Sequence, residues 1–297
     1  MTVEEENVFD IKIDFEKGKG DPARVFRTMT GLIESVQSLD YHLAQSINVS
    51  IQAKITLEDI EVGSLRAKLK NIVEQTTDDT LKKHDIVPAV GQYLQQAKHK
   101  VVDWCTGKNE IKDRTEVQQL QKQILQLAEK TDVNHLPAYA PLETEALLSD
   151  INSIQESLSY LEKGDNATLN SQQGTSNFNP SLQVSPIIVR EMLTKENIEN
   201  VGIRILKVKK PDFLGNSKWS CKYKGTSYDA AINDKQWLIK FQNRLVNLQP
   251  GDAIKAKVRE IVSYGYYGEI VNTDYEVLEV IEVLHAQRLT QRDLLDE

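Results

Sequence analysis

The stretch that decides how this chain is organised is KGDNATLNSQQGTSNFNPSLQV, residues 163–184. Asn, Ser, Gln, Gly and Thr dominate it, and its apolar residues are scattered. Such a composition buries too little apolar surface to offset the conformational entropy that is lost on ordering. We therefore interpret residues 163–185 as a flexible linker that divides the chain into two folded parts.

The composition is that of a soluble globular protein of about two domains, with 297 residues, of which 40% are hydrophobic and 27% charged. Its apolar runs are far shorter than the roughly 20 residues that span a bilayer, and the N-terminus MTVEEENVF is acidic, unlike a signal peptide. We therefore expect a cytoplasmic protein without membrane contact. Cys105 and Cys221 lie far apart, which favours two free thiols over a disulfide or a zinc site.

Charge is unevenly divided along the chain. Residues 1–185 contain 19 basic and 28 acidic side chains, a net charge of −9, whereas residues 186–297 contain 17 and 16, a net charge of +1. Because an acidic surface repels nucleic acid, any contact with nucleic acid is expected from the C-terminal part.

The N-terminal part, residues 1–112, has the pattern of an α/β domain. Apolar and polar residues alternate, as in strands with one buried face, over residues 9–15, 49–57 and 65–69. Asp21 and Pro22 are typical of a helix start, and apolar residues recur at helical spacing from Val25 to Leu43. The order strand, helix, strand, strand predicts a small sheet with a long helix on one face. The preceding GKGDP segment carries a carboxylate where a phosphate would bind, so we interpret it as a turn and cap.

After a further helix from Pro88 to Cys105, a pair of helices is predicted within residues 113–162. Asp113 followed by Glu116 resembles a capping box. The apolar seam of the pair consists of Leu120, Ile124, Leu127, Ile151, Ile154 and Leu158. Two interpretations stay open: a helical hairpin that packs on its own sheet domain, or an interface for self-association or a protein partner. Neighbouring glutamines, which cost little to desolvate, favour the interface.

The C-terminal part, residues 186–286, is predicted to be β-rich and is followed by a polar tail, residues 287–297. Strand-like patterns cover residues 201–208, 218–223, 226–232, 253–262 and 269–284. Asp234 precedes a short helix between them. Mostly antiparallel strands with one helical insertion predict a small barrel or bent sheet of SH3-like or OB-like size. The chain as a whole is therefore expected to be α+β.

Basic and aromatic residues of the C-terminal part form a candidate contact surface for single-stranded nucleic acid. Its candidate residues are Lys218, Lys222, Lys255, Lys257, Arg259 and Tyr266. The alternative is an ordinary solvated sheet, because residues 269–282 carry five acids and no bases. Acidic and basic strands of one sheet neutralise each other across the ladder.

The sequence contains no motif of a hydrolase, kinase, phosphate-binding loop or zinc protease, and no cofactor or metal is expected. The five histidines are scattered, and His84 and His99 are interpreted as solvated or capping. The first hypothesis for function is a non-enzymatic interaction or assembly component of a cytoplasmic complex, with partner surfaces on two parts joined by a linker. The second is a nucleic-acid-binding accessory protein that uses the C-terminal basic face, and the third is an enzyme with an unrecognised site.

Overall fold

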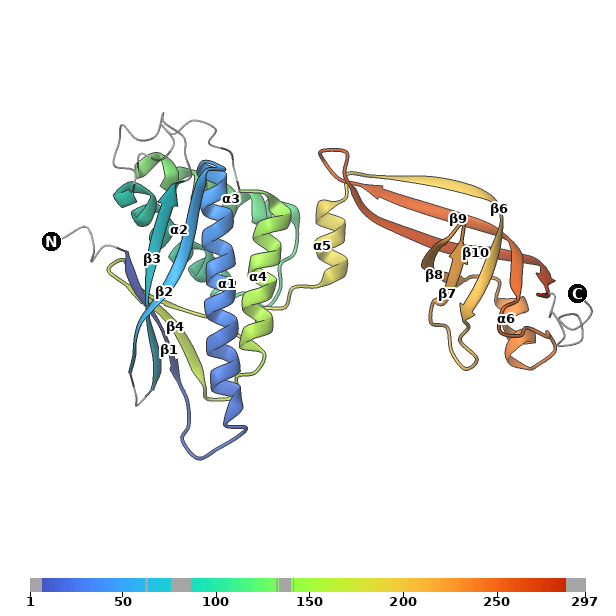
Figure 1. The fold of residues 1–297 in the computed structure, drawn as a ribbon, viewed down its shortest axis with the longest axis horizontal. Coiled ribbons are helices and arrows are strands. Elements are labelled where there is room, and N and C mark those ends of the chain that lie inside the picture. Colours follow the sequence, from blue (N-terminus) through green and yellow to red (C-terminus); the bar gives the residue numbers. More distant parts are fainter. Residues whose placement is uncertain are drawn as a thin grey trace, which may run out of the picture. The chain divides into compact units, whose positions relative to one another are not determined.

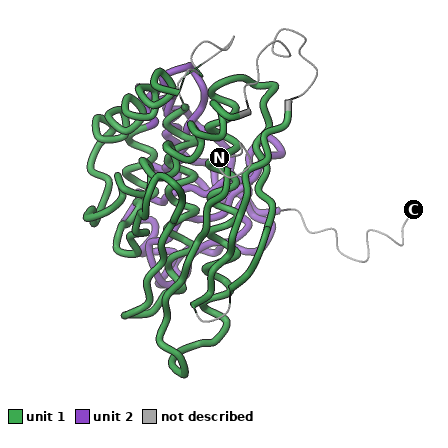
Figure 2. The backbone as a smooth tube through the Cα atoms, turned by 90° about the vertical axis from the view of Figure 1, so that its left-hand side faces the viewer, with its two compact units in different colours: residues 1–192 green, residues 193–297 purple. Residues whose placement is uncertain are grey.

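The chain divides into two compact units, residues 1–192 and residues 193–297, which are coloured separately in Figure 2. The computed structural model describes residues 7–61, 64–75, 87–131, 133, 140 and 142–286. The polar tail predicted at residues 287–297, and most of the connection within the predicted helical pair, lie outside the described residues.

The first unit is built on an antiparallel sheet with the strand order β2-β3-β1-β4-β5 (Figure 1). Its elements are β1 (Val8–Asp14), α1 (Ala23–Ile47), β2 (Ile51–Glu61), β3 (Leu65–Gln75), α2 (Val87–Cys105), α3 (Arg114–Lys130), α4 (Thr144–Leu158), β4 (Asn166–Ser171), β5 (Gly174–Asn177) and α5 (Pro186–Leu193). The predicted order strand, helix, strand, strand is confirmed.

The helices cover one face of this sheet. In β1, Phe9, Ile11 and Ile13 are buried in a core that they share with α1 and α4, because alternate side chains of a strand point to the same face. The intervening Asp10 and Lys12 are only half-buried and lie on the other face. This alternation is the pattern of a sheet with helices on one side and solvent on the other.

The predicted flexible linker is wrong. Residues 166–177 form β4 and β5, and β4 is paired on both sides, with β1 and with β5. Leu169 and Ala167 supply a buried face, while the polar side chains that suggested a linker line the opposite face. There the Nδ2 of Asn170 donates to Oδ1 of Asp10 at 2.8 Å. The outward residues of β4 are Asn166, Thr168 and Asn170. They give the strand the composition of a loop, but neighbouring residues satisfy its polar groups.

The predicted domain boundaries change accordingly. Helices α3 and α4 belong to the first unit, because their apolar residues enter the same core as α2. Residues 186–192 of α5 fall within the predicted C-terminal part, yet Met192 near the end of α5 is buried in the core of the first unit. The division between the units therefore follows residue 192 rather than residue 163.

The second unit is a closed barrel with the strand order β10-β8-β7-β6-β9. This confirms the small barrel that was predicted for the C-terminal part. Its elements are β6 (Glu196–Lys210), β7 (Trp219–Tyr223), β8 (Thr226–Ile232), α6 (Lys235–Gln242), β9 (Ala253–Tyr264) and β10 (Ile270–Leu284). All neighbouring strands are antiparallel except β8 and β10. The carboxylate of Asp234 caps α6 by accepting from the backbone N–H of Trp237, and also accepts from that of Val280 in β10.

Limited proteolysis of the whole chain is expected to leave residues 166–177 intact, because a protease binds an unpaired extended segment and β4 is hydrogen-bonded on both sides. Thermolysin digestion followed by mass spectrometry checks this, with a sample unfolded in urea as the control that Leu169 can be cut. Early cleavage between residues 166 and 177 of the folded protein would restore the linker interpretation.

Candidate functional site

The basic residues of β9 are neutralised by β10. Lys255, Lys257 and Arg259 share the outer face of the barrel, because the residues between them are buried or face inward. In the ladder their partners on β10 are Glu282, Glu279 and Glu276. The Nε of Arg259 lies 2.9 Å from Oε2 of Glu276, and Nζ of Lys255 lies 3.9 Å from Oε2 of Glu282. The cross-strand neutralisation considered from the sequence thus applies to Lys255 and Arg259, whereas Lys257 lies opposite Glu279 without an ion pair between the two side chains.

Strands β6 and β7 differ, because their lysines face each other. Lys222 of β7 is directly opposite Lys207 of β6, and both side chains are exposed. Neither forms an ion pair with any residue that the structure describes. Like charges directly opposite in a ladder are destabilising, so an anion that binds between them would relieve repulsion. The candidate Lys218, by contrast, is bonded through Nζ to Oδ1 of Asp274 at 2.7 Å.

Two further lysines extend this pair. Lys209 follows Lys207 on the outer face of β6 and donates from Nζ to Oγ of Ser227 at 3.2 Å. Lys224 lies in the turn after β7, with a φ of 47° and its Nζ 5.4 Å from the ring centroid of Tyr223. We call Lys207, Lys209, Lys222 and Lys224 the basic face. All four belong to the basic run that the sequence shows over residues 201–224, but only Lys222 is among the candidate contact residues predicted from it. The apolar Leu206 and Val208 on either side of Lys207 indicate that Lys207 points outward.

Exposed aromatic and apolar residues lie in two loops of the barrel. The turn between β9 and β10 carries the candidate Tyr266, 45% exposed, and Tyr267, 87% exposed. The loop between β6 and β7 carries Phe213, 60% exposed, which stacks on Phe241 with centroids 5.2 Å apart. Asp212 holds this loop, since its carboxylate accepts from Oγ and N of Ser217 and from two further backbone N–H groups. These bonds, that of the Ser217 hydroxyl first, lower the pKa of Asp212.

One basic residue of β6 is not available on the surface. Arg204 faces inward, where its guanidinium donates to Glu260 at 2.6 Å and lies 5.2 Å from the ring centroid of Tyr223. Its side chain is 12% exposed. The hydrogen bond to Glu260 raises the pKa of Arg204. The charge of Arg204 is thus paired inside the barrel, and we do not count this residue among those that could contact a ligand.

The predicted assembly seam lies inside the first unit. Leu120, Ile124, Ile151, Ile154 and Leu158 are at most 3% exposed and belong to the cores that α3 and α4 share with α1, α2 and the sheet. Leu127 is partly buried against the same core. The interpretation of these residues as an interface between chains is therefore wrong, because their apolar surface is already covered within one chain.

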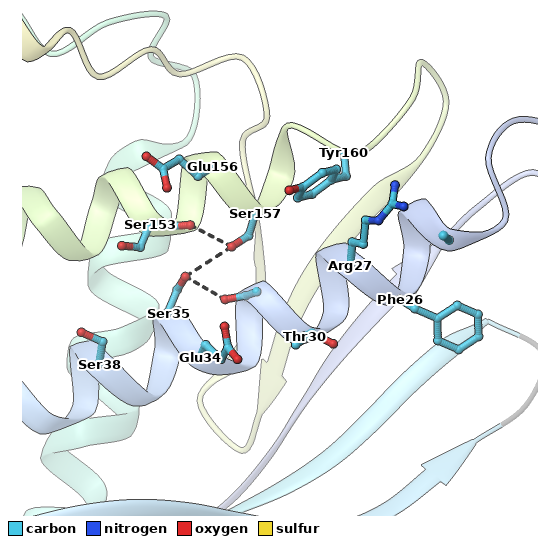
Figure 3. A pocket seen from close by; sticks show the side chains of 12 residues that line it. Phe26, Arg27, Thr30, Glu34, Ser35, Ser38, Ser153, Glu156, Ser157 and Tyr160 are labelled. Carbon is cyan, nitrogen blue, oxygen red and sulfur yellow. Dashed lines mark hydrogen bonds between the residues drawn. The ribbon is translucent and has the colours of Figure 1, made fainter.

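A groove of about 700 Å³ runs between α1 and α4 (Figure 3). Its floor is formed where the helices approach closely: a Cβ added to Gly31 would lie 2.4 Å from Oγ of Ser157. The hydroxyls of Ser35 and Ser157 donate to carbonyls of their own helices, each at 2.8 Å. The serines of this groove are thus explained by helix packing, since a small side chain that satisfies itself allows a close approach.

The arrangement closest to a catalytic site lies beside this groove. The buried carboxylate of Asp150 accepts from Oγ of Ser38 at 2.7 Å and contacts Nδ1 of His42 at 2.8 Å. Burial raises the pKa of Asp150. A nucleophilic site needs the serine against the histidine, whereas here both contact the carboxylate. Within the described ranges, no cluster of three potential metal ligands occurs either.

Of the remaining histidines, the structure describes His99 and His285, and His285 contacts Oδ2 of Asp252 through Nδ1 at 3.0 Å. His99 was interpreted as solvated or capping, but it is buried between the hydroxyls of Ser176 and Ser171, 2.6 and 2.8 Å from its two ring nitrogens. This correction follows from β4 and β5, which bring both serines to α2. His84 lies outside the described residues.

Comparison of this chain with protein-family models, with curated proteins and with solved structures finds no match. Among the helices that the structure describes, none is both long enough and apolar enough to cross a membrane.

Proposed function

We propose that this chain binds single-stranded nucleic acid through the basic face of its barrel and catalyses no reaction on it. The connectivity supports this proposal, because α6 lies between the third and fourth strands and the third strand pairs in parallel with the fifth. This is the connectivity of OB-type barrels, which bind oligonucleotides on their second and third strands and on the loops between strands 1 and 2 and between strands 4 and 5. Here these are β7, β8 and the loops 211–218 and 265–269.

Analogy of fold does not by itself assign a function, so the proposal is carried by the lysine pair. Lys207 and Lys222 place two ammonium groups opposite each other without a described counter-ion, and Lys209 and Lys224 continue the positive charge along β6 and β7. Phosphates of a nucleic-acid backbone match such a line of charges. The exposed rings of Phe213 and Tyr267 in the two loops suit the stacking of unpaired bases.

The charge of the remaining chain is consistent with binding at one face. Residues 1–185 carry a net charge of −9 and repel a polyanion, so an oligonucleotide is directed to the second unit. The outer faces of β9 and β10 offer no net positive charge, because each basic residue of β9 on this face lies opposite a glutamate of β10. The hypothesis of an interaction or assembly component stays a prediction, but the helical seam no longer supplies its surface.

Binding of a fluorescein-labelled oligothymidylate to the whole chain tests the proposal directly. If the four lysines of the basic face contact phosphates, the logarithm of the affinity should fall with the logarithm of salt concentration at a slope of about −3, since each contact contributes about −0.7 for a single strand. Fluorescence anisotropy titrations between about 50 and 200 mM salt measure this slope. No binding at the lowest salt concentration would overturn the proposal.

Replacing Lys207 and Lys222 with glutamine is expected to weaken oligonucleotide binding at low salt by about tenfold or more and to make the salt slope shallower by about 1.4, because two phosphate contacts are lost. The matched control is Lys255→Gln with Lys257→Gln, which removes the same number of lysines from β9, where each lies opposite a glutamate of β10. The same anisotropy titrations compare the two variants. If only the control variant loses affinity, the β9 face is the interface instead.

A further inference from the structure

The barrel carries an open sheet edge that the nucleic-acid proposal does not use. Residues 196–206 of β6 pair with β9, from Glu196 opposite Tyr264 to Leu206 opposite Ile254. On its other side, β6 has no strand partner among the described residues before Lys207, where its pairing with β7 begins. In such a strand alternate residues direct both main-chain groups to the open side. A partner strand could therefore add there by regular hydrogen bonding.

The middle of this edge carries exposed apolar side chains, whereas edge strands that pair with nothing usually carry residues that prevent the addition of another strand. Val201, Ile203 and Ile205 share the outer face and are 46%, 64% and 53% exposed. Natural edge strands are usually blunted by lysine, proline or a bulge. Residues 196–206 contain no proline or lysine, and the ladder with β9 runs through them without a shift of register. Their charged residues are Glu196 and Glu199 at one end and the inward-facing Arg204, so the stretch of the outer face from Val201 to Ile205 carries no charge. An edge with these properties is the geometry of strand addition.

The charge at one end of the edge indicates what the added strand carries. The open edge ends where Lys207 and Lys222 lie opposite each other, close to Lys224 in the turn after β7. We propose that β6 accepts an extended segment of a protein partner as an additional strand, with apolar side chains at alternate positions beside Val201, Ile203 and Ile205. The same segment carries a carboxylate at the end next to Lys207 and Lys222. Main-chain bonds would supply affinity, and these side chains specificity.

A second copy of the chain fits this edge poorly. Two β6 edges related by a two-fold axis through Val201 would set Glu199 opposite Ile203 and Asn197 opposite Ile205. A register that sets Val201 opposite Ile203 or Ile205 moves residues 196 and 197 alongside Lys207 and beyond, where β7 is already paired. The edge therefore suits a partner whose own sequence alternates, rather than itself.

The test is selection of a phage-displayed library of random twelve-residue peptides against the whole chain. Enriched peptides are expected to carry β-branched or aromatic residues at alternate positions and an Asp or Glu at one end. Their affinity, measured by fluorescence anisotropy, should fall about tenfold for the variant V201T/I203T, which keeps β-branched side chains and removes apolar surface. The matched control I270T/I281T changes two exposed isoleucines of β10 and should leave affinity unchanged. Bound peptide should also slow amide exchange in residues 196–206.

Each contrary outcome is distinct. Failure to enrich alternating peptides, or equal binding to V201T/I203T, would overturn the proposal. Conversion of a dimer to a monomer by V201T/I203T in light scattering would identify a second copy as the occupant instead. Peptide binding only after removal of residues 287–297 would identify this chain's own C-terminus. Oligonucleotide binding should be the same for V201T/I203T and the parent chain, so failure here leaves the nucleic-acid proposal to its own titration.

Discussion

Replacement of Ile124 with aspartate is expected to unfold the first unit. Ile124 is 2% exposed and lies in the core formed with Leu120, Leu147 and Ile151. The substitution removes a buried aliphatic side chain, which lowers the free energy of unfolding by about 2–5 kcal/mol. It also places a carboxylate among apolar side chains, which adds the cost of burying an unpaired charge. The total exceeds about 5 kcal/mol and is comparable to the whole stability of a domain.

Far-ultraviolet circular dichroism checks this prediction, because five of the six helices that the structure describes belong wholly or almost wholly to the first unit and the second unit is mostly strand. Gln123→Asp is the control, since its neighbouring position on α3 is exposed and should cost no more than about 0.5 kcal/mol. A variant that keeps its helical signal and forms a smaller particle in light scattering would show that the seam is shared between chains after all.

The second large effect is expected at Lys98, whose ammonium is buried with the carboxylate of Asp40. Its Nζ donates to Oδ2 of Asp40 at 2.9 Å and to Oδ1 of Asn71 at 3.1 Å, and it lies 3.9 Å from the ring centroid of Phe9. Burial lowers the pKa of Lys98 and raises the pKa of Asp40. Lys98→Met leaves that carboxylate unpaired in the core, and we expect a loss of about 3–5 kcal/mol of unfolding free energy.

Urea unfolding at several pH values measures this loss. Without Lys98, the folded-state pKa of Asp40 lies still further above its unfolded value, so the folded protein takes up a proton that the unfolded protein lacks. The deficit of Lys98→Met should therefore shrink as the pH is lowered. Lys54→Met, which breaks the exposed pair with Glu74, should cost at most about 1 kcal/mol. If the two variants lose equally little, the buried pair does not stabilise the unit.

Local patterns predicted most elements of the fold. The bounds of β8 coincide with the predicted residues 226–232, and Asp113 accepts from the N–H of Glu116 as its spacing suggested. These features depend on residues that are close in sequence. The strand β4 was missed because only Ala167 and Leu169 mark its buried face, and its polar face is satisfied by residues such as Asp10, which lies far away in the sequence.

The candidate site shows the same division. Alternate positions in β9 put Lys255, Lys257 and Arg259 on one face, but whether their charges are available depends on the register with β10, which no local pattern specifies. The opposition of Lys207 and Lys222 is likewise set by the pairing of β6 with β7. Whether a basic side chain already has an acidic partner depends on which strands are neighbours in the assembled sheet. Composition alone therefore selected Lys218, Lys255 and Arg259, which already form ion pairs.

The position of β1 in the middle of its sheet has a consequence for synthesis on the ribosome. β1 is made first, pairs with β3 soon afterwards, and waits for β4, which begins about 150 residues later. At translation rates of about 5–20 residues per second, one edge of β1 stays unpaired for roughly 8 to 30 seconds. During that time the nascent chain exposes the edge of β1 to which β4 later adds. We therefore expect the sheet of the first unit to be completed late, and its open edge to be a binding site for a chaperone until then. The strands of the barrel, by contrast, follow one another in the sequence and pair soon after they are made.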